Sequence, residues 1–468
     1  MKNAKKSLLA GMFAAIAAVS HAADVENLIV RQQWPWSTSV KVECTLADVT
    51  SPVDLAIEVY NGANKIDPAL VEGALSGERF AIKDGGVKTF YIDPVKVCGA
   101  AKASIPDFRV KVAAVPADDK YNEVLYKIVN LESPYDVEDV TRAMLLNGEM
   151  GAVETEYSAL HPSFTTPLDD VIIWTGVTND VKYKTTHLVL RKIPAKGQEF
   201  LFRYGHAVSN EVSVQTAAGT TSEGTSTSFS SDYYLGVFEL TQSQWLKVLP
   251  FPDGSAWETN ALYAATRPVD RCYYSSRTRG TKLGVMWPEK GHTDVDENTF
   301  FKYLQDRVGL VFDFPTEAMW EFAYRAGTKS GLYTGMEYNF ENFALISRQR
   351  GINRPNEQTS ADRNCDLSDG PNQVGSYLPN AWGLYDMVGN VRERCLDVYD
   401  TKYIYPVGSV DLSGSPRHNA LSGRVARGGS YIVAPLNNRY CPIRESVSYS
   451  DACKYTGIRV CLYSDVNL

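Results

Sequence analysis

The segment from Asp386 to Glu393 constrains the fold most strongly, because it places a sharp turn between two acidic side chains. The two carboxylates lie seven residues apart around Gly389-Asn390, a pair that favours turns. A tight turn between them exposes backbone carbonyl oxygens, and carboxylates together with carbonyl oxygens are ligands for a hard cation. The segment therefore predicts either a calcium-binding loop or a capped, buried turn without metal.

Residues 1–22 have the pattern of a secretory signal peptide. A basic start with Lys2, Lys5 and Lys6 precedes an apolar run from Leu8 to Val19, and small residues allow cleavage after Ala22. The apolar run is too short to span a membrane, and no Cys follows the cleavage site to carry a lipid anchor. We therefore expect an exported protein that is periplasmic, cell-surface or secreted.

The length and charge of the chain limit its organisation and its partners. A chain of 468 residues is too long for one hydrophobic core and suits two or three domains. Loss of the three N-terminal lysines changes the formal net charge from −8 to −11. A net acidic chain without a basic block argues against nucleic acid or an anionic membrane as partner.

Eight cysteines, an even number, together with export to an oxidising compartment favour disulfides over free thiols. Cys44 and Cys98 lie alone in the N-terminal part and are candidates for a mutual disulfide. The pairing of the other six is left open; they are Cys272, Cys365, Cys395, Cys441, Cys453 and Cys461. No C-x-x-C pair occurs, which argues against a zinc ribbon or a thioredoxin-type site.

The hydrophobic pattern of residues 24–135 predicts short strands separated by turns such as Asn61-Gly62. Apolar and polar residues alternate from Val40 to Leu46, and again from Glu123 to Val129. This pattern is typical of a small, immunoglobulin-like β-sandwich. Nothing in it points to catalysis, so we expect a docking or spacer module.

Three further segments follow before the chain becomes rich in motifs. Residues 136–182 read as a connector, with a helix expected from Val137 to Asn147. A second domain is expected over residues 183–468, beginning with a strand at His187. Residues 207–231 are rich in Ser, Thr and Gly and predict a solvated, mobile loop.

Local signals in this domain define two helices. Thr241 is a good N-cap, and Gln244 three residues later completes a capping box. A second helix is expected after Pro315, with Trp320 on its apolar face and Gly327 at its end.

Five motif-like runs occur in order through this domain. They span residues 232–245, 267–270, 312–327, 374–393 and 424–431, followed by Arg444 and Gly457-Ile458-Arg459. Together they resemble the motif series of the sulfatase-modifying-factor (formylglycine-generating enzyme) family. The resemblance implies an irregular α+β fold related to C-type lectins, with many loops.

The resemblance also implies a ligand set for the acidic turn. In the family this segment resembles a Ca²⁺ site, with side-chain ligands at the positions of Asp386 and Glu393. Backbone oxygens come from the positions of Gly389 and Val391. We therefore expect structural Ca²⁺ here.

The resemblance implies catalytic chemistry, but the residues that this chemistry requires are missing from this chain. Formylglycine-generating members oxidise a sulfatase Cys by means of two reactive Cys after the Gly-Gly-Ser motif, which bind copper. No Cys occurs in residues 431–440, and Cys441 alone cannot supply two thiolates. The six histidines are scattered, so the three-His iron site of a related branch is not supported either. Copper is therefore not expected.

Two arginines also depart from the family pattern. Arg392 and Arg394 stand where the family has Trp on both sides of the acid at Glu393. They could favour a carboxylate or sulfate group, or they could be solvated or paired with Asp397 and Asp400.

These observations favour an exported, non-catalytic binding protein whose ligand is a protein, peptide or glycan. The expected ligand cleft consists of Ser430, Tyr431, Arg439, Tyr440, Arg444 and Arg392. An active formylglycine-generating or related oxidase is the alternative, because the scaffold motifs are kept. A structural cell-surface component attached through its N-terminal module is a third possibility.

Overall fold

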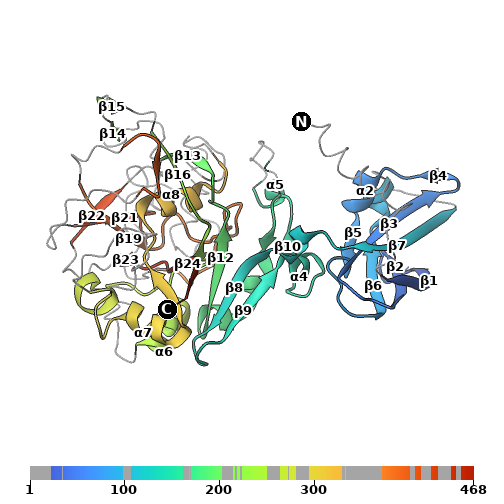
Figure 1. Cartoon of the computed structure of the whole chain (residues 1–468), viewed down its shortest axis with the longest axis horizontal. Coiled ribbons are helices and arrows are strands. Elements are labelled where there is room, and N and C mark those ends of the chain that lie inside the picture. The colour runs from blue at the N-terminus through green and yellow to red at the C-terminus, as the bar shows by residue number, and fades with distance from the viewer. Residues whose placement is uncertain are drawn as a thin grey trace. The chain divides into compact units, whose positions relative to one another are not determined.

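We describe the protein from a computed structural model (Figure 1). It describes residues 23–33, 35–98, 107–161, 168, 170–202, 214–216, 219–221, 224–249, 264–271, 273–280, 295–328, 333, 371–400, 406–412, 423–430, 444–448 and 455–467. The expected signal peptide, 1–22, lies outside these residues. The chain divides into two compact units: Met1–Leu125 with Val140–Val153, and Tyr126–Asp139 with Glu154–Leu468.

The first unit contains two antiparallel sheets. The four-stranded sheet has the order β1 (Asp24–Gln32), β2 (Val40–Ala47), β6 (Gly86–Ile92), β5 (Leu75–Gly77), and the three-stranded sheet has the order β4 (Asn64–Lys65), β3 (Val53–Asn61), β7 (Phe108–Pro116). Alternate residues of β2 are buried, and Val42, Val59 and Phe90 share one core cluster. The predicted alternating strands are therefore present, whereas the immunoglobulin-like topology stays a prediction.

Short helical elements complete the first unit: α2 (Pro68–Glu72), α3 (Pro94–Cys98), η2 (Asp119–Asn122) and α4 (Arg142–Leu146). Cys44 is buried in the core between strands, while Cys98 at the end of α3 is exposed. Both are free thiols, so the mutual disulfide considered from the sequence is not formed.

The boundary between the units differs from the predicted one. Strand β8 (Val124–Asn130), expected in the first domain, pairs with β12 (His187–Ile193) in the second unit's largest sheet. The helix expected from Val137 to Asn147 is instead β9 (Val137–Thr141) followed by α4. Thr141 ends the strand and caps the helix, since its hydroxyl accepts a hydrogen bond from the Met144 N–H.

The second unit is built from several small sheets. The largest has the order β18 (Leu310–Asp313), β24 (Cys461–Asn467), β17 (Tyr233–Gly236), β12, β8, β9, and a four-stranded sheet has the order β22 (Glu445–Val447), β21 (Arg424–Arg427), β19 (Arg392–Val398), β23 (Thr456–Gly457). Smaller groups are β13 (Glu199–Phe202), β16 (Thr225–Ser228), β20 (Ser409–Val410); the hairpin β14 (Val214–Thr216), β15 (Gly219–Thr221); and the pair β10 (Val153–Glu154), β11 (Ile173–Trp174).

Helices are short in this unit: α5 (Tyr157–Leu160), η3 (Thr175–Thr178), η4 (Val181–Lys184), α6 (Gln242–Val248), η5 (Ala264–Thr266), η6 (Tyr274–Thr278), α7 (Phe300–Val308) and α8 (Glu317–Arg325). The longest of them, α7 and α8, have nine residues, so no helix in the described part of the chain could cross a membrane. The many short elements agree with the irregular fold implied by the resemblance.

Several local predictions are confirmed in this unit. The strand expected at His187 is β12, and the capping box of Thr241 with Gln244 begins α6. The expected loop at 207–231 is only partly a loop, because its described residues include β14, β15 and β16. In β16, Thr225 and Thr227 are buried in alternation, which suits β-branched residues.

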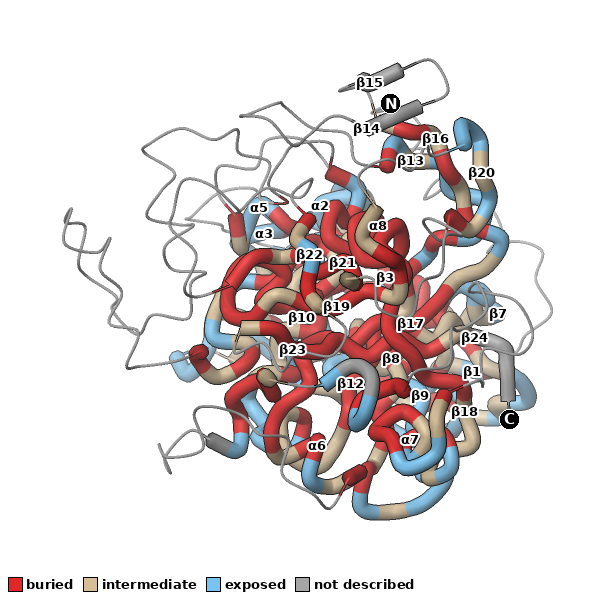
Figure 2. The backbone as a smooth tube through the Cα atoms, turned by 90° about the vertical axis from the view of Figure 1, so that its left-hand side faces the viewer, coloured by how far each residue is buried: buried red, intermediate tan, exposed pale blue. Residues whose placement is uncertain are grey.

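Helix α8 lies in the core of the second unit and positions the candidate site. All nine of its residues are buried, and Figure 2 shows its tube largely in the colour of buried residues. Thr316 caps its start, and Ala326 adopts a left-handed conformation (φ 44°) at its end. Pro315 therefore lies one residue before the N-cap. The helix ends at Ala326 in the left-handed conformation, and Gly327, the predicted end, follows it.

Candidate functional site

The sequence motifs of the second unit meet around Trp320 of α8. The indole N–H of Trp320 donates to Glu393 Oε2 over 2.6 Å, and the Arg427 guanidinium lies 5.3 Å from its ring centroid. Gly428 approaches so closely that a Cβ there would lie 3.3 Å from the Trp320 ring. Runs far apart in sequence thus form one buried framework.

The acidic turn adopts the sharp conformation that its glycine and asparagine predict. Asp386, Gly389 and Asn390 have positive φ values of 59°, 87° and 50°. Its backbone is held by Glu239, whose carboxylate accepts hydrogen bonds from the Asn390 side-chain amide (2.5 Å) and the Val391 N–H (3.0 Å). The sequence motifs assigned no role to Glu239, although it lies two residues before Thr241 of the capping box.

Asp386 has one oxygen without a hydrogen-bond partner. Its Oδ2 accepts from the Gly375 N–H over 2.6 Å, whereas Oδ1 is buried and accepts no hydrogen bond from the described residues. Burial raises the pKa of Asp386 to about 6, opposed by the Gly375 N–H and the charges of Arg459 and Lys184. A cation at Oδ1 would satisfy this atom.

Glu393, the other expected ligand, is bound by protein groups. Arg459 donates from Nη2 to Oε1 (2.6 Å) and from Nε to Oε2 (2.9 Å). Burial raises the pKa of Glu239 well above its usual range, and the charges of Asp386 and Glu393 add to the effect. The charges of Glu239, Asp386 and Glu393 all act on Arg459, and a neutral, protonated Glu239 limits the net negative charge in the described part of the site.

No group of three or more His, Cys, Asp or Glu side chains is arranged to hold a metal within the described ranges. Any cation at the turn would therefore depend on the Asp386 and Glu393 side chains with backbone oxygens, at the positions of Gly389 and Val391. Such a mixed set is ordinary for Ca²⁺.

A second buried network extends along α8. Glu317 accepts from Arg427 Nη1 (2.5 Å) and Arg444 Nη2 (2.8 Å), and Glu321 accepts from Arg427 Nη2 (2.8 Å) and Arg325 Nη2 (2.8 Å). All five side chains are buried. This chain of alternating charges fixes Arg444 by hydrogen bonds that sequence patterns do not reveal.

Asp397 joins this network through the helix start. Its Oδ2 accepts the Glu317 N–H over 2.6 Å. Burial, with the neighbouring Glu317 carboxylate, raises the pKa of Asp397 to about 7, against the opposing effects of that N–H and of Arg444.

Three of the six residues expected in the ligand cleft are described by the structure: Arg392, Ser430 and Arg444. Ser430 is buried, and its hydroxyl has no hydrogen-bond partner within the described residues. Arg392 pairs with Glu445 and donates to Thr456 Oγ1 (2.8 Å), while the fully buried Arg394 donates to the Ser448 carbonyl (3.2 Å). Tyr431, Arg439 and Tyr440 lie outside the described residues.

The two described thiols of this unit are ill suited to metal binding. Cys395 and Cys461 are fully buried free thiols in the core around α8. Burial raises the pKa of both well above the usual range, so they remain protonated at neutral pH. Copper(I) needs thiolates, so these residues do not fit the copper site implied by the resemblance.

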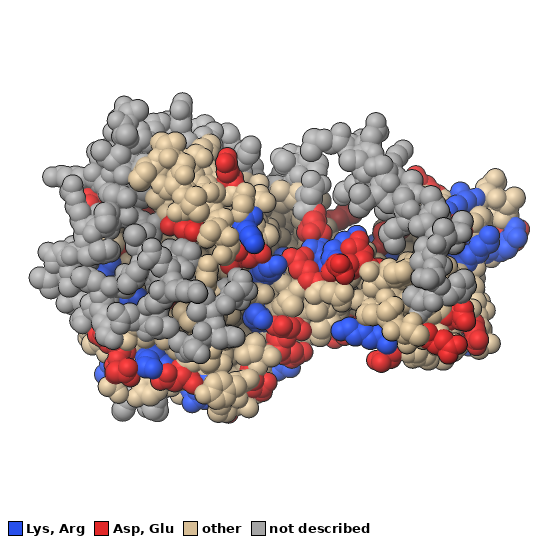
Figure 3. Space-filling view, in the orientation of Figure 1, with Lys and Arg blue, Asp and Glu red and all other residues tan. Residues whose placement is uncertain are grey.

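Among the pockets lined by described residues of the second unit, two have volumes of several hundred Å³. One of about 910 Å³ lies beside α8 and is lined by Phe322, Arg325 and Trp382 among others. The other, of about 400 Å³, includes His161, Gly375 and Tyr385. Basic and acidic side chains are mixed on the described surface of the face shown in Figure 3.

Comparison with known proteins supports the family resemblance. The model of the "Sulfatase-modifying factor enzyme 1-like domain" family matches residues 209–463. A curated protein named "Chaperone protein LppX" from Paenibacillus barcinonensis is 31% identical over 183 residues, 35% of this chain and 62% of its own length. A "Formylglycine-generating enzyme" from Streptomyces coelicolor is 36% identical over 128 residues, 27% of this chain and 37% of its own length. The chain thus spans less than two thirds of either relative.

Among solved structures, "Treponema denticola variable protein 1" is similar with a TM-score of 0.42 and 20% sequence identity. The match covers 60% of this chain and 96% of that one.

Proposed function

Because the chain belongs to the sulfatase-modifying factor enzyme 1-like family, we propose that it is an exported member that binds a ligand without the family's oxidation chemistry. The observation that carries this proposal is the absence of Cys from residues 431–440, directly after Arg427-Gly428-Gly429-Ser430. Two thiolates at this place are what the copper-dependent reaction requires. Cys395 and Cys461 do not replace them, since both are buried and protonated.

The proposed ligand surface centres on Ser430 and Arg444. The buried hydroxyl of Ser430 has no hydrogen-bond partner among the described residues, so it is a group that a ligand could satisfy. Arg444 is held by Glu317 and by the Asp400 carbonyl (3.3 Å), so its position costs little entropy on binding. With Tyr431, Arg439, Tyr440 and Arg392 this surface would accept a protein, peptide or glycan, while the immunoglobulin-like N-terminal unit would serve as a docking or spacer module.

Calcium at the acidic turn is part of this proposal. Asp386 Oδ1 is buried and has no hydrogen-bond partner among the residues that the structure describes. Asp386 and Glu393, with the backbone oxygens of Gly389 and Val391, would hold Ca²⁺ and stiffen the turn. The ion would be structural, since its proposed ligands form a scaffold.

A conversion assay tests the loss of oxidation chemistry. The purified full-length chain, reduced and supplied with copper and oxygen, is incubated with a peptide that carries the Cys motif of a sulfatase. We expect no aldehyde product by mass spectrometry, while a formylglycine-generating enzyme in parallel converts the same peptide. Conversion by this chain that survives removal of trace contaminants would reject the proposal.

The alternative is an active formylglycine-generating or related oxidase that uses an unrecognised site. Curated relatives named formylglycine-generating enzyme, at 36% and 30% identity, favour it. The same assay separates the two functions, because only the oxidase gives product.

A further inference from the structure

The pocket of about 910 Å³ beside α8 shares no described lining residue with the proposed ligand surface or the acidic turn. Its lining comes from three places: the start of β13, the end of α8 and the segment around Trp382. The lining residues are Pro194, Gln198, Glu199, Phe200, Leu201, Phe322, Arg325, Gly327, Thr328 and Trp382. Its volume of about 910 Å³ is in the range of small-molecule sites.

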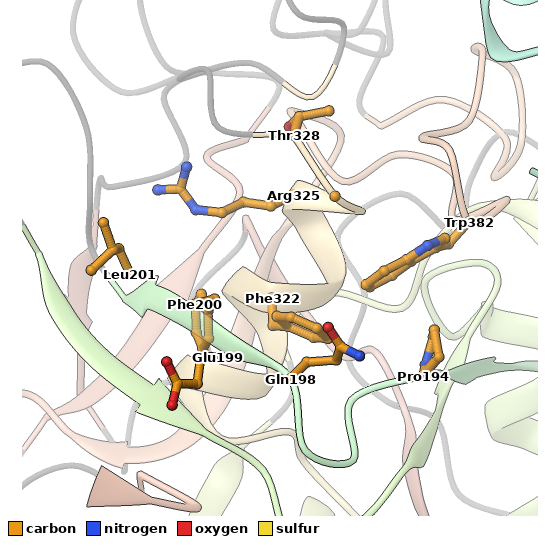
Figure 4. A pocket seen from close by; sticks show the side chains of 10 residues that line it. Pro194, Gln198, Glu199, Phe200, Leu201, Phe322, Arg325, Thr328 and Trp382 are labelled. Carbon is orange, nitrogen blue, oxygen red and sulfur yellow. The ribbon is translucent and has the colours of Figure 1, made fainter. Parts of the chain in front are cut away.

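Aromatic rings form one wall of this pocket. Phe322 and Trp382 have ring centroids 5.2 Å apart, and Phe200 meets Phe322 edge-on at 5.1 Å. In Figure 4 the side chains of Gln198, Phe322 and Trp382 lie around the same hollow. Trp382 is only partly buried, so part of its indole is open to a ligand.

Polar groups line the same pocket. The Thr328 hydroxyl is buried, with 7% of the residue exposed, and accepts or donates no hydrogen bond within the described residues. Leaving a buried hydroxyl unpaired costs free energy, which a ligand hydroxyl could recover. Gln198 and Glu199 are exposed at the rim and add an amide and a carboxylate.

The charges and polar groups that line the pocket argue against anionic ligands and against purely apolar ones. Arg325 donates from Nε (3.0 Å) and Nη2 (2.8 Å) to Glu321 Oε1, so its charge is compensated inside the protein. Among the described lining residues, a phosphate or carboxylate ligand would therefore find no uncompensated cation, and it would face Glu199. A purely apolar chain would leave the Thr328 hydroxyl unsatisfied.

We propose that this pocket binds a neutral saccharide, whose C–H faces stack on Trp382 and Phe322 while its hydroxyls bond Thr328 and Gln198. A sugar ring combines an apolar face with a hydroxyl edge, which is the combination of groups that the pocket presents. The inference goes beyond the proposed function, because it concerns a different surface and holds whether or not oxidation chemistry is lost.

The test uses the full-length chain and a panel of neutral gluco-, manno-, galacto- and N-acetylglucosamine oligosaccharides. Binding is followed by calorimetry and by tryptophan fluorescence. We expect at least one oligosaccharide to bind, with roughly tenfold weaker affinity in Thr328→Val, which removes one hydrogen bond at constant shape. Trp382→Ala should abolish binding, and Trp382→Phe should retain part of it.

Trp36→Ala is the matched control, since Trp36 is 90% exposed in the first unit and should not affect affinity. Thr328→Val keeps the test decisive if Trp382→Ala does not fold. Absence of binding to the whole panel would overturn the inference. So would binding that Thr328→Val leaves unchanged, or that only Arg392→Ala weakens, because that result would move the saccharide to the Ser430 surface.

Discussion

Arg459 and Glu393 form a fully buried, two-pronged ion pair, with Nη2–Oε1 and Nε–Oε2 distances of 2.6 and 2.9 Å. Arg459 also donates to the carbonyls of Gly236, Val237 and Tyr385, so it ties strand β17 and the acidic turn to the end of the chain. The last motif in the sequence thus holds the turn that precedes it by some seventy residues.

Replacement of this arginine should destabilise the second unit strongly. Arg459→Met leaves the Glu393 carboxylate buried without its partner, and such a loss costs about 3–5 kcal/mol. Urea unfolding monitored by tryptophan fluorescence measures the change. Lys302→Met, which removes an exposed pair with Asp306 on α7, is the control and should change the free energy of unfolding little. Equal effects of the two substitutions would contradict the importance assigned to Arg459.

Gly428 should tolerate a methyl group less well than Gly408. Both glycines have positive φ, at 89° and 73°, so alanine at either costs roughly 1 kcal/mol from backbone strain. Only at Gly428 would the new Cβ also press on Trp320 (3.3 Å) and the Met387 carbonyl (3.4 Å), whereas nothing lies within 4 Å at Gly408. The melting temperature of Gly428→Ala should therefore be lower than that of Gly408→Ala. The reverse order would refute the close packing of Gly428 against Trp320.

Asp397 should make the stability of the fold depend on pH. Its pKa is raised from 3.8 to about 7, so the folded state binds a proton more tightly than the unfolded state. Its contribution is therefore fully present below about pH 4 and declines as the pH rises from about 4 to 7. Asp397→Asn keeps an acceptor for the Glu317 N–H but cannot ionise.

The melting temperature of Asp397→Asn minus that of the wild type should consequently increase as the pH is raised from 5 to 8. Asp180→Asn is a control at an exposed helix cap. A difference between Asp397→Asn and wild type that stays constant over this range would show that Asp397 titrates normally.

Removal of calcium should lower the melting temperature of the second unit. An ion that binds only the folded state at a hundred times its Kd adds about 2.7 kcal/mol. Calorimetric scans with Ca²⁺ and with chelator measure the shift, which Asp386→Ala should abolish. Asp306→Ala on α7 should leave it intact. A wild-type melting temperature that is insensitive to Ca²⁺ would exclude the ion.

Features set by neighbouring residues could be predicted from the sequence. The capping box of Thr241 and Gln244, the turn at Gly389-Asn390 and strand β12 depend on local chemistry, and each is present. The domain boundary predicted at residue 135 differs from the division between the two units. The alternating pattern of β8 predicts a strand, but it does not show which strand β8 pairs with. Only pairing with His187–Ile193 assigns β8 to the second unit.

Only those parts of the candidate site that lie within a sequence motif could be predicted from the sequence. The acidic turn stood out, but Glu239 holds it from a position about 150 residues earlier, and no spacing rule connects the two. Likewise Arg444 was expected in a ligand cleft, whereas its bond to Glu317 depends on the packing of α8 against β21. Such contacts depend on tertiary structure rather than on local pattern.

Copper(I) binding distinguishes a non-catalytic member of the family from a copper-dependent oxidase. The reduced full-length protein is titrated with Cu(I) in competition with a chromophoric chelator, with a formylglycine-generating enzyme as positive control. We predict that the chain takes no stoichiometric Cu(I) from the chelator, because residues 431–440, directly after Ser430, contain no Cys. One equivalent of tightly held Cu(I), lost on Cys441→Ser, would show instead that the chain keeps a copper site.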